Sequence, residues 1–504
     1  MKRNVEALTD GTFDLLVVGG GITGAGVALD ASLRGLRVAL IDKGDFASGT
    51  SSVSSKLVHG GLRYLEHAGF HLVHEALHER GRLLHNACHL VQPLRFILPF
   101  YDGARLSPWK WRLGLTLYDF LAGTSNIHRH RPLRRREIRR EFPTLVRHGL
   151  QGGAEFFDAQ MDDARLCIEV MRTAAECGAT PANYVEATAF TSRNGRITGV
   201  RARDHVGDRE IVIAARQFLN AAGPWVDRVC QLAGDDSGPR LQPTRGVHIL
   251  TADRGLRAAF LLLHPSDGRV LFIIPWMGKT LIGTTDTFAD TGPDDLHVTD
   301  GEIAYLLEAH NHYFQPGLQP SDVMGSFIGL RPLIRSERGG PSSLSREFRV
   351  FTSPSGLVSV AGGKYTTFRQ MAEDITDVLV ARLDGPRRRC STRRFPLSGV
   401  PSEPWLEYSA SASAELEQRF KLPRATAQHL VNRYGRHALE LAHYLDQSPE
   451  ARQPVCAGEP ELRGEFAYQR DHEMAVYPAD HLLRRTRLGM YHPDLLRGKI
   501  RESS

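Results

Sequence analysis

The chain has 504 residues, of which 41% are hydrophobic and 24% charged, and its formal net charge at pH 7 is +6. This length predicts two or three domains, and the composition is typical of a folded, soluble protein. The small net charge does not by itself indicate nucleic acid, and no zinc-finger, basic-zipper or RNA-binding aromatic motif adds to it. The six cysteines never approach C-x-x-C spacing, so neither a zinc site nor a dithiol redox pair is expected.

The sequence contains no segment that is expected to cross a membrane. Residues 1–13 lack the apolar stretch of a secretory signal, and the longest apolar runs, such as 270–277, are too short to span a bilayer. We therefore expect a cytoplasmic protein in a reduced setting. If it meets a membrane, it should lie on the surface.

Residues 14–42 predict a dinucleotide-binding unit of strand, turn, helix and strand. Gly19 permits a tight turn after the strand 15–18, Gly21 lets backbone N–H groups approach a pyrophosphate, and Gly24 lets the helix pack against the strand. The second strand, 37–41, ends on Asp42, whose carboxylate can accept hydrogen bonds from adenosine ribose hydroxyls. The alternative is an ordinary glycine-rich turn between a strand and a helix.

A loop rich in glycine and serine is predicted for residues 43–64. Beside a dinucleotide it would supply short hydroxyl donors, namely Thr50, Ser51, Ser52, Ser54 and Ser55. Four larger polar side chains follow in quick succession, namely Lys56, His59, Arg63 and Tyr64. A solvated loop is the alternative, although such a loop rarely runs directly into the sequence GGLRY.

Two later segments could contact a membrane surface. Residues 107–121 are expected to form a helix that carries Trp109 and Trp111 beside Lys110 and Arg112. A partly buried helix capped by basic residues is an equally good interpretation. The most basic run, residues 128–142, is expected to be a solvated helix face, although a minority of such runs contact anionic lipid.

The middle of the chain alternates strands and helices. A helix over 66–88, a strand over 94–100, and a strand from 156 followed by a helix over 163–177 are expected. Strands near 182–186 and 197–204 follow, with a turn at Asn194-Gly195 before the second. The strand that begins near residue 216 runs into Ala221, Ala222 and Gly223, whose small size would let the chain approach a cofactor again.

Residues 245–364 carry further candidate site residues. A β-rich insert of three strands is expected over 245–285, and His248 lies in the first strand. Arg331 and Arg346 follow, and a last strand, 357–361, ends at Gly363 and Lys364. A helix over 366–383 starts at once, and its N-terminus offers backbone donors to an anion.

The C-terminal part has a different character. A composition change at 385–396 suggests a linker, and residues 401–504 are expected to form a separate helical domain. Its helices are predicted over 409–420, 424–434, 436–445, 464–475 and 478–489.

Taken together, these motifs closely resemble the FAD-dependent glycerol-3-phosphate dehydrogenases, the aerobic, quinone-linked branch of flavoproteins of the D-amino-acid-oxidase type. The most specific piece is TSSVSSKLVHGGLRYLE, residues 50–66, and NAAGPWVD, RGVHI, IGTTDT, GLRPL and AGGKYTTFR support it. The tail DHLLRRTRLG, residues 480–489, is similar to the family's C-terminal domain. Thr23 and Tyr365 are mild departures, and the basic run 128–142 lies outside the pattern.

The resemblance implies an α/β fold: a Rossmann-type FAD-binding domain, an inserted β-rich substrate or cap domain, and a helical C-terminal domain. The oxidoreductase region would span 13–385, with FAD-binding segments at about 13–90, 155–235 and 345–385, and cap segments at about 91–154 and 240–344. Residues 386–400 would be the linker. FAD is the implied cofactor, and no metal is expected. The residues implied to bind FAD are Gly19, Gly21, Gly24, Asp42, Thr50, Ser51, Ser54, Lys56, Leu57, His59, Gly223, Trp225, Gly363 and Thr366.

The implied reaction oxidises sn-glycerol 3-phosphate to dihydroxyacetone phosphate by hydride transfer to FAD, because no side chain can accept a hydride. Guanidinium groups recognise phosphate oxygens bidentately. By resemblance, the residues that hold the phosphate or flank the substrate are Arg63, Tyr64, Arg331 and Lys364. Arg346 would join them, although it could equally be a surface residue on a connecting loop.

His248 is the preferred base for the proton of the C2 hydroxyl, since an imidazole titrates near working pH. A strand histidine that only makes a structural hydrogen bond is the alternative. Lys364 and the helix start after it would stabilise negative charge on the reduced flavin. The predicted catalytic residues are therefore His248, Arg331 and Lys364.

The resemblance also implies partners: a membrane quinone, the inner face of the cell membrane as a peripheral binding surface, and a second copy of the chain in a homodimer. An oxidase that passes electrons to oxygen is one alternative. Another flavin enzyme of this fold, acting on a different small anionic substrate, is a second. A binding or tRNA-modifying flavoprotein is the third, and the lack of a C-x-x-C pair and the isolation of the basic runs argue against it.

Overall fold

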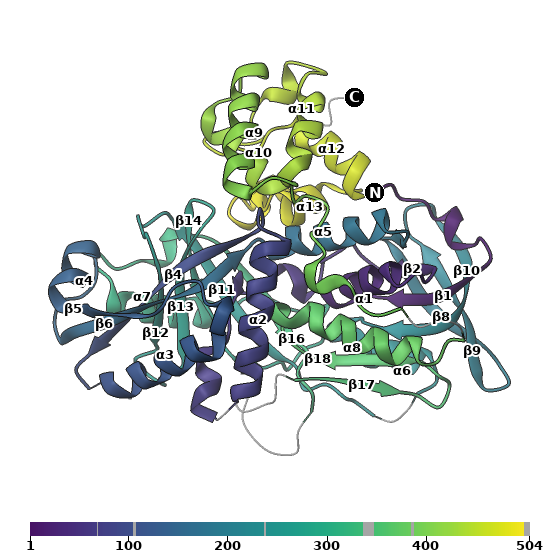
Figure 1. Cartoon of the computed structure of the whole chain (residues 1–504), viewed down its shortest axis with the longest axis horizontal. Helices are drawn as coiled ribbons and strands as arrows, with labels where there is room; N and C mark the ends of the chain where they lie inside the picture. Colours follow the sequence, from purple (N-terminus) through teal and green to yellow (C-terminus); the bar gives the residue numbers. More distant parts are fainter. Residues whose placement is uncertain (68, 104–106, 236–237, 336–346, 385–387, 498–504) are drawn as a thin grey trace.

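The computed structural model describes residues 1–67, 69–103, 107–235, 238–335, 347–384 and 388–497. Two large β-sheets lie side by side, each covered by helices, and a helical C-terminal region sits on one end of the molecule (Figure 1). This is the α/β architecture that the sequence predicts.

The first sheet is built around β1 and has a mainly parallel core. Its strands are, in spatial order, β17 (Phe348–Thr352), β18 (Val358–Gly362), β10 (Arg209–Asn220), β1 (Thr12–Val18), β2 (Val38–Ile41) and β7 (Thr180–Ala182). All neighbours pair in parallel except β17, which closes one edge antiparallel to β18. A hairpin of β8 (Val185–Arg193) and β9 (Arg196–Asp204) continues the sheet from β10, and its turn is the predicted Asn194-Gly195.

Small residues let the helices of this sheet pack closely. The three helices are α1 (Ile22–Leu33), α5 (Asp163–Glu176) and α8 (Phe368–Val380). A Cβ atom on Gly26 of α1 would lie 3.0 Å from the ring of Phe368 and 3.1 Å from Ala372, so α1 and α8 meet at a glycine. Their apolar faces form one core with Leu15 and Val17 of β1. This packing fixes the position of the N-terminus of α1.

The second sheet is mostly antiparallel and corresponds to the expected β-rich part. Its strands are, in spatial order, β15 (Thr287–Phe288), β11 (Thr244–Ala252), β14 (Lys279–Gly283), β13 (Val270–Trp276), β12 (Ala259–Leu263), β4 (Val91–Tyr101), β6 (Leu150–Met161) and β3 (Leu57–Val58). β16 (Val323–Arg331) also pairs with β11, and β5 (Arg131–Arg134) pairs with β6.

Helices cover both faces of the second sheet. α2 (Phe70–Asn86) and α3 (Pro108–Ala122) share one core with β4, and α4 (Arg135–Glu141) and α7 (Asp300–Tyr313) share another. Sequence reasoning missed β12 and α7. The capping box of α7, in which Thr299 and Glu302 bond to each other's backbone, was a readable signal for its start.

The aromatic and basic helix α3 is half exposed. Trp111 is only 8% exposed because it packs into the core beneath the sheet, which fits the alternative of a partly buried helix. Trp109 and Leu113 are each 63% exposed, and Phe120 is 78% exposed. They are spaced so that they share one face of the helix.

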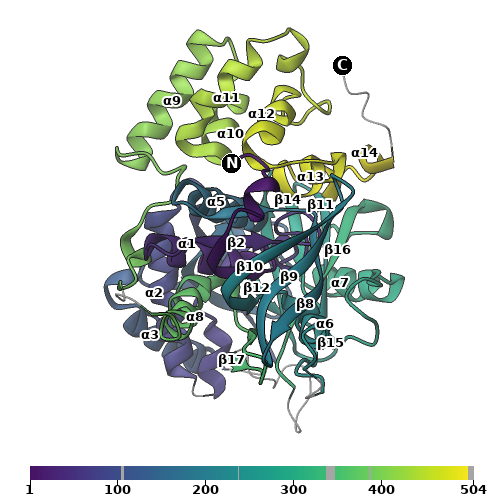
Figure 2. The same cartoon turned by 90° about the vertical axis from the view of Figure 1, so that its right-hand side faces the viewer.

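The C-terminal region is helical, as predicted. Its helices are α9 (Trp405–Arg419), α10 (Arg424–Tyr434), α11 (Ala438–Leu445), α12 (Gly464–Glu473), α13 (Pro478–Asp480) and α14 (Asp494–Arg497). Figure 2 shows them stacked above α5. The single helix expected over 478–489 is wrong, because α13 passes into a π-helical turn, His481–Arg485, and then a 3-10 turn, Leu488–Met490. α6 (Val226–Leu232), which follows β10, completes the main helices.

Candidate active site

A cleft runs between the two sheets and is lined from both. The first sheet contributes the ends of β1 and β18, and the second contributes β11 and the end of β16. The serine-rich segment 48–59 lies along the same cleft. Glycine turns, short hydroxyls and cationic side chains, which are far apart in the sequence, therefore face one space.

The turn before α1 has the geometry that a pyrophosphate requires. Gly19 has a φ of +117°, and a Cβ atom there would lie 2.5 Å from the carbonyl oxygen of Ala221. A side chain on Gly24 would collide with the carbonyl of Gly19, so α1 packs directly on the turn. Gly21 precedes α1 and faces the Ser51 hydroxyl, which accepts the N–H of Ile22 at 2.9 Å. Only glycine leaves this cradle open.

Asp42 lies at the end of β2 and lines the cleft. Its carboxylate accepts the N–H of Gly20 at 2.6 Å and that of Gly44 at 2.8 Å. Burial raises the pKa of Asp42 to about 6. The two backbone bonds hold the carboxylate at the edge of the glycine turn, where a ribose would lie.

The serine-rich loop is held from inside the protein. Thr50 donates to the carbonyl of Leu330 at 2.7 Å, and the Ser54 hydroxyl bonds to Asp163 at 2.7 Å. Both residues, with Leu57 and His59, line the cleft.

The Lys56 side chain does not reach the cleft, although it was implied as a cofactor ligand. It is fully buried, its ammonium lies 2.8 Å from Asp163, and it donates to the Ser52 carbonyl at 2.6 Å. Burial lowers the pKa of Lys56 to about 8. Sequence reasoning missed the role of Asp163, whose only signal was its place in an acidic pair at the start of α5.

The second half of the chain returns to the cleft in two places. Gly223 and Trp225 lie after β10, and the Trp225 indole donates to Asp294 at 3.0 Å. Gly363, with a φ of +94°, and Thr366 lie after β18, where the Thr366 hydroxyl accepts the N–H of His59 at 3.3 Å. The structure thus brings the implied FAD ligands together, with the exception of the Lys56 side chain and of Gly24, which shapes the turn from behind.

His248 and Arg331 come from the paired strands β11 and β16. The Arg331 guanidinium lies 3.0 Å from Asp286 and also donates to the Thr284 hydroxyl at 3.1 Å. A side chain on Gly246 would collide with it, which explains a glycine in the middle of β11. The Arg331 side chain is 21% exposed, so a ligand in the cleft can reach it.

His248 is held in place and kept neutral. Its ring stacks on Phe327 with centroids 4.8 Å apart, and its Nε2 lies 2.9 Å from the Ser55 hydroxyl. Burial, and then the nearby Arg331 guanidinium, lower its pKa well below the usual value of 6.5. Within the described residues, its Nδ1 has no hydrogen-bond partner. A neutral imidazole can accept a proton, which suits it to act as a base.

A second cavity adjoins the cleft. Both are lined by His59, Tyr64 and Arg331, and the second cavity also contains Arg63. The Lys364 ammonium lies 3.9 Å from the centroid of the Tyr64 ring, so these two candidates are in contact. Arg346 lies outside the described residues. Sequence reasoning missed Arg269, which lines the second cavity and carries no motif of its own.

Comparisons with known proteins agree with this geometry. Residues 14–369 match the model of a family described as FAD dependent oxidoreductase, and residues 390–501 match the C-terminal domain of alpha-glycerophosphate oxidase. The chain is 36% identical to the aerobic glycerol-3-phosphate dehydrogenase of Bacillus subtilis, over 96% of this chain and 88% of that protein. The corresponding protein of Staphylococcus saprophyticus is also 36% identical, over 95% of this chain and 87% of that protein.

Solved structures show the same fold. The glycerol-3-phosphate dehydrogenase from Bacillus halodurans complexed with FAD matches with a TM-score of 0.82 and 32% identity, over 98% of this chain and 89% of that chain. An L-alpha-glycerophosphate oxidase from Mycoplasma pneumoniae with FAD bound matches with a TM-score of 0.58 and 18% identity, over 77% of this chain and 98% of that chain, which supports the fold alone.

Proposed function

This chain belongs to the FAD-dependent oxidoreductase family that includes the aerobic glycerol-3-phosphate dehydrogenases, and from that premise we propose that it oxidises sn-glycerol 3-phosphate to dihydroxyacetone phosphate. FAD, when bound, supplies the hydride acceptor that no side chain provides. The observation that carries the proposal is that His248, Arg331 and Lys364 line the same cleft as the glycine turn before α1.

The cationic residues account for a phosphorylated substrate. Arg331 is positioned by Asp286 and Thr284 and is exposed to the cleft, so its planar guanidinium can bind phosphate oxygens without first being ordered. Arg63 lies in the adjoining cavity, and Lys364 rests on the Tyr64 ring. These residues bind and orient the phosphate, and Lys364 would also stabilise negative charge on the reduced flavin.

His248 removes the proton from the substrate hydroxyl. Its lowered pKa keeps the imidazole neutral at working pH, so it can accept a proton. The stacked Phe327 ring and the Ser55 hydroxyl fix its orientation. Together these two contacts hold the imidazole ring in one orientation, which favours proton transfer along one direction.

Anaerobic reduction of the flavin tests the proposal. We expect the absorbance of the purified holoprotein to be bleached by glycerol 3-phosphate and not by glycerol, which lacks the phosphate. Failure of glycerol 3-phosphate to bleach the flavin would show that the substrate is different. Equal bleaching by glycerol would show that the protein does not recognise the phosphate group.

We further propose that a membrane quinone takes the electrons. The exposed face of α3 supports this, because Trp109, Leu113 and Phe120 lie on it beside Lys110 and Arg112. Among the described residues, no helix has both the length and the apolar character needed to cross a bilayer, so contact would be at the surface.

Oxygen is the second candidate acceptor, because the C-terminal region matches a domain of an oxidase. Formation of one peroxide per substrate, without reduction of a soluble quinone, would favour oxygen.

Vesicle binding tests the surface contact. Leu113→Glu should weaken cosedimentation with vesicles of phosphatidylglycerol and phosphatidylcholine, because it places a charge on the apolar face. Leu406→Glu is the matched control, since Leu406 is 82% exposed on α9. Equal loss in both variants would contradict docking through α3. The cytoplasmic location and the homodimer stay predictions. Light scattering would measure the molar mass in solution and so test the homodimer.

A further inference from the structure

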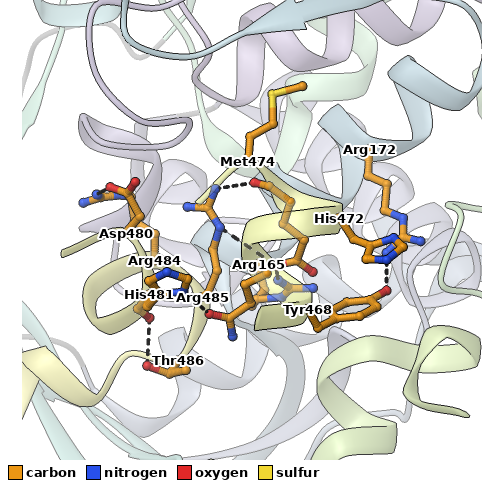
Figure 3. Close-up of polar contacts among 12 residues, drawn as sticks. Arg165, Arg172, Tyr468, His472, Met474, Asp480, His481, Arg484, Arg485 and Thr486 are labelled. Atoms are coloured by element: carbon orange, nitrogen blue, oxygen red, sulfur yellow. Dashed lines mark hydrogen bonds and ion pairs between the residues drawn. The ribbon is translucent and has the colours of Figure 1, made fainter. Parts of the chain in front are cut away.

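Three arginines of the C-terminal domain reach into the FAD-binding domain. Arg484 and Arg485 are the last two residues of the π-helical turn, and Arg487 follows it. Arg484 and Arg485 bind Asp45, and Arg487 binds Asp162 and Asp163. Figure 3 shows Arg484 and Arg485 together with Asp480 and Arg165. Because each carboxylate belongs to a segment next to the cleft, the C-terminal domain contacts the walls of the cofactor site.

The first contact fixes the loop after β2. Asp45 accepts Nε of Arg484 at 2.5 Å and Nη2 of Arg485 at 3.0 Å, and it also binds the Asn183 amide at 3.0 Å. Burial alone would raise the pKa of Asp45, but the two arginines lower it, so the carboxylate stays ionised. The neighbouring Gly44 donates to Asp42. The arginines therefore act on the ribose end of the cleft through one short loop.

The second contact fixes the serine-rich loop. Arg487 donates to Asp162 at 2.9 Å, to the Ser52 carbonyl at 3.2 Å and to Asp163. Asp163 also binds Lys56, the backbone of Ser54 at 2.9 Å and its hydroxyl at 2.7 Å. Asp163 is therefore the point at which the loop 50–56 and the C-terminal domain meet.

The backbone at this meeting point is unusual. Lys56 has a φ of +60° and Arg487 a φ of +71°, so both cations around Asp163 adopt a left-handed conformation that side chains disfavour. The preceding turn, His481–Arg485, is π-helical, a rare form that occurs mostly as single turns and frequently at functional sites. Such conformations persist where the surrounding contacts require them.

We propose that the segment 480–487 positions the cofactor site: through Asp45 and Asp163 it holds the two loops that line the cleft, and the C-terminal domain is therefore needed to retain FAD. Arg484, Arg485 and Arg487 are positioning residues, since they act through these carboxylates. The inference goes beyond the proposed reaction and depends only on FAD binding, so it can fail or hold whatever the substrate is.

Arg172 provides a matched control. It is also a buried arginine between the domains, but it binds the Tyr468 hydroxyl at 2.6 Å (Figure 3). It also binds His437 at 3.2 Å and Glu176 at 3.1 Å, and none of these three partners lines the cleft. Arg172→Met should loosen the domain interface without moving the cofactor loops. Arg487→Met removes a guanidinium of the same kind from the cofactor side.

The experiment measures FAD release and unfolding separately on the holoprotein. After dilution, flavin fluorescence should rise at least about tenfold faster in Arg487→Met than in the unchanged protein, the change that about 1.4 kcal/mol produces. On heating, FAD release should precede the loss of helical circular dichroism in this variant, whereas the two should coincide in Arg172→Met. Arg487→Lys, which keeps the charge, should recover part of the retention.

Two outcomes would overturn the proposal. One is an unchanged rate of FAD release in Arg487→Met. The other is release that coincides with unfolding in Arg487→Met as it does in Arg172→Met, which would assign these arginines to domain stability alone. If Arg487→Met does not fold, Arg484→Met takes its place, because Arg485 still pairs with Asp45 there, and the same two criteria apply.

Discussion

Arginines gather in two regions of this molecule, the interface between α5 and the C-terminal domain and the substrate end of the cleft, and they differ in burial. At the interface, the side chains of Arg165 and Glu473 are 1% and 0% exposed and lie 2.6 Å apart. At the cleft, Arg331 also has a carboxylate partner, Asp286, yet its side chain is 21% exposed. A guanidinium that is buried with its carboxylate affects the stability of the fold, whereas one that faces a cavity can also bind an anion.

The largest expected effect concerns His248, the proposed base in the cleft. His248→Asn should lower kcat by about 10²- to 10⁴-fold, the usual contribution of a positioned proton acceptor. Steady-state kinetics with glycerol 3-phosphate measure this. His264→Asn is the control, because His264 is also buried and stacked, with its ring 3.6 Å from that of Tyr305, but it does not line the cleft. A loss of stability without a loss of kcat in His248→Asn would support a structural hydrogen bond instead.

At the interface, removal of one partner should act on stability. Arg165→Met should lower the free energy of unfolding by about 3–5 kcal/mol, because it leaves Glu473 buried without its closest cation. Chemical denaturation measures the change. The KM for glycerol 3-phosphate should stay the same. A raised KM would contradict the prediction that Arg165 affects stability and not substrate binding.

At the cleft, the same kind of change should act on binding. Arg331→Ala should cost about 2–5 kcal/mol of interaction with the phosphate, which appears as a lower kcat/KM. Arg245→Ala is the control, because Arg245 lies on the same strand pair but binds Glu302 at 2.6 Å and does not line the cleft. An unchanged kcat/KM in Arg331→Ala would show that Arg331 does not bind the phosphate.

The smallest expected effects depend on pH and have different origins in the two regions. The pKa of His248 is lowered, so the base form persists as pH falls, and kcat/KM should decline only below about pH 6.5.

At the interface, burial would raise the pKa of Glu473, but Arg165 beside it lowers the pKa. Its stabilisation is therefore present above the unfolded pKa of about 4.3 and is lost as pH falls through the lower folded pKa. The loss of stability in Arg165→Met, relative to the unchanged protein, should therefore shrink as pH falls through this range.

Local patterns made much of the fold predictable. The turn from β1 to α1 depends on glycines that are close in sequence, and the helices α10 and α12 begin where the sequence places them. The sequence predicts one helix over residues 478–489. The structure breaks this helix, since Arg484 and Arg485 must both reach Asp45 and Arg487 must reach Asp163. Contacts across several hundred residues override local propensity there.

Lys56 shows the same limit at the candidate site. Its place in a cofactor motif suggested a ligand, and only the approach of Asp163 makes it a buried ion pair. Trp111 and Trp109 are two positions apart on α3, yet the first is in the core and the second is exposed. Which side of the helix meets the sheet is a property of packing, which composition does not express.

The sequence by itself determined that a dinucleotide would lie at the glycine turn, that Asp42 would end the next strand, and that histidine and arginine side chains suited to a phosphorylated alcohol are present. These follow from short-range rules of backbone conformation and from the chemistry of each side chain. Only the tertiary structure decided which cations face the cleft and which are sealed beside carboxylates at the domain interface. Burial sets that difference, and burial depends on segments far apart in the chain.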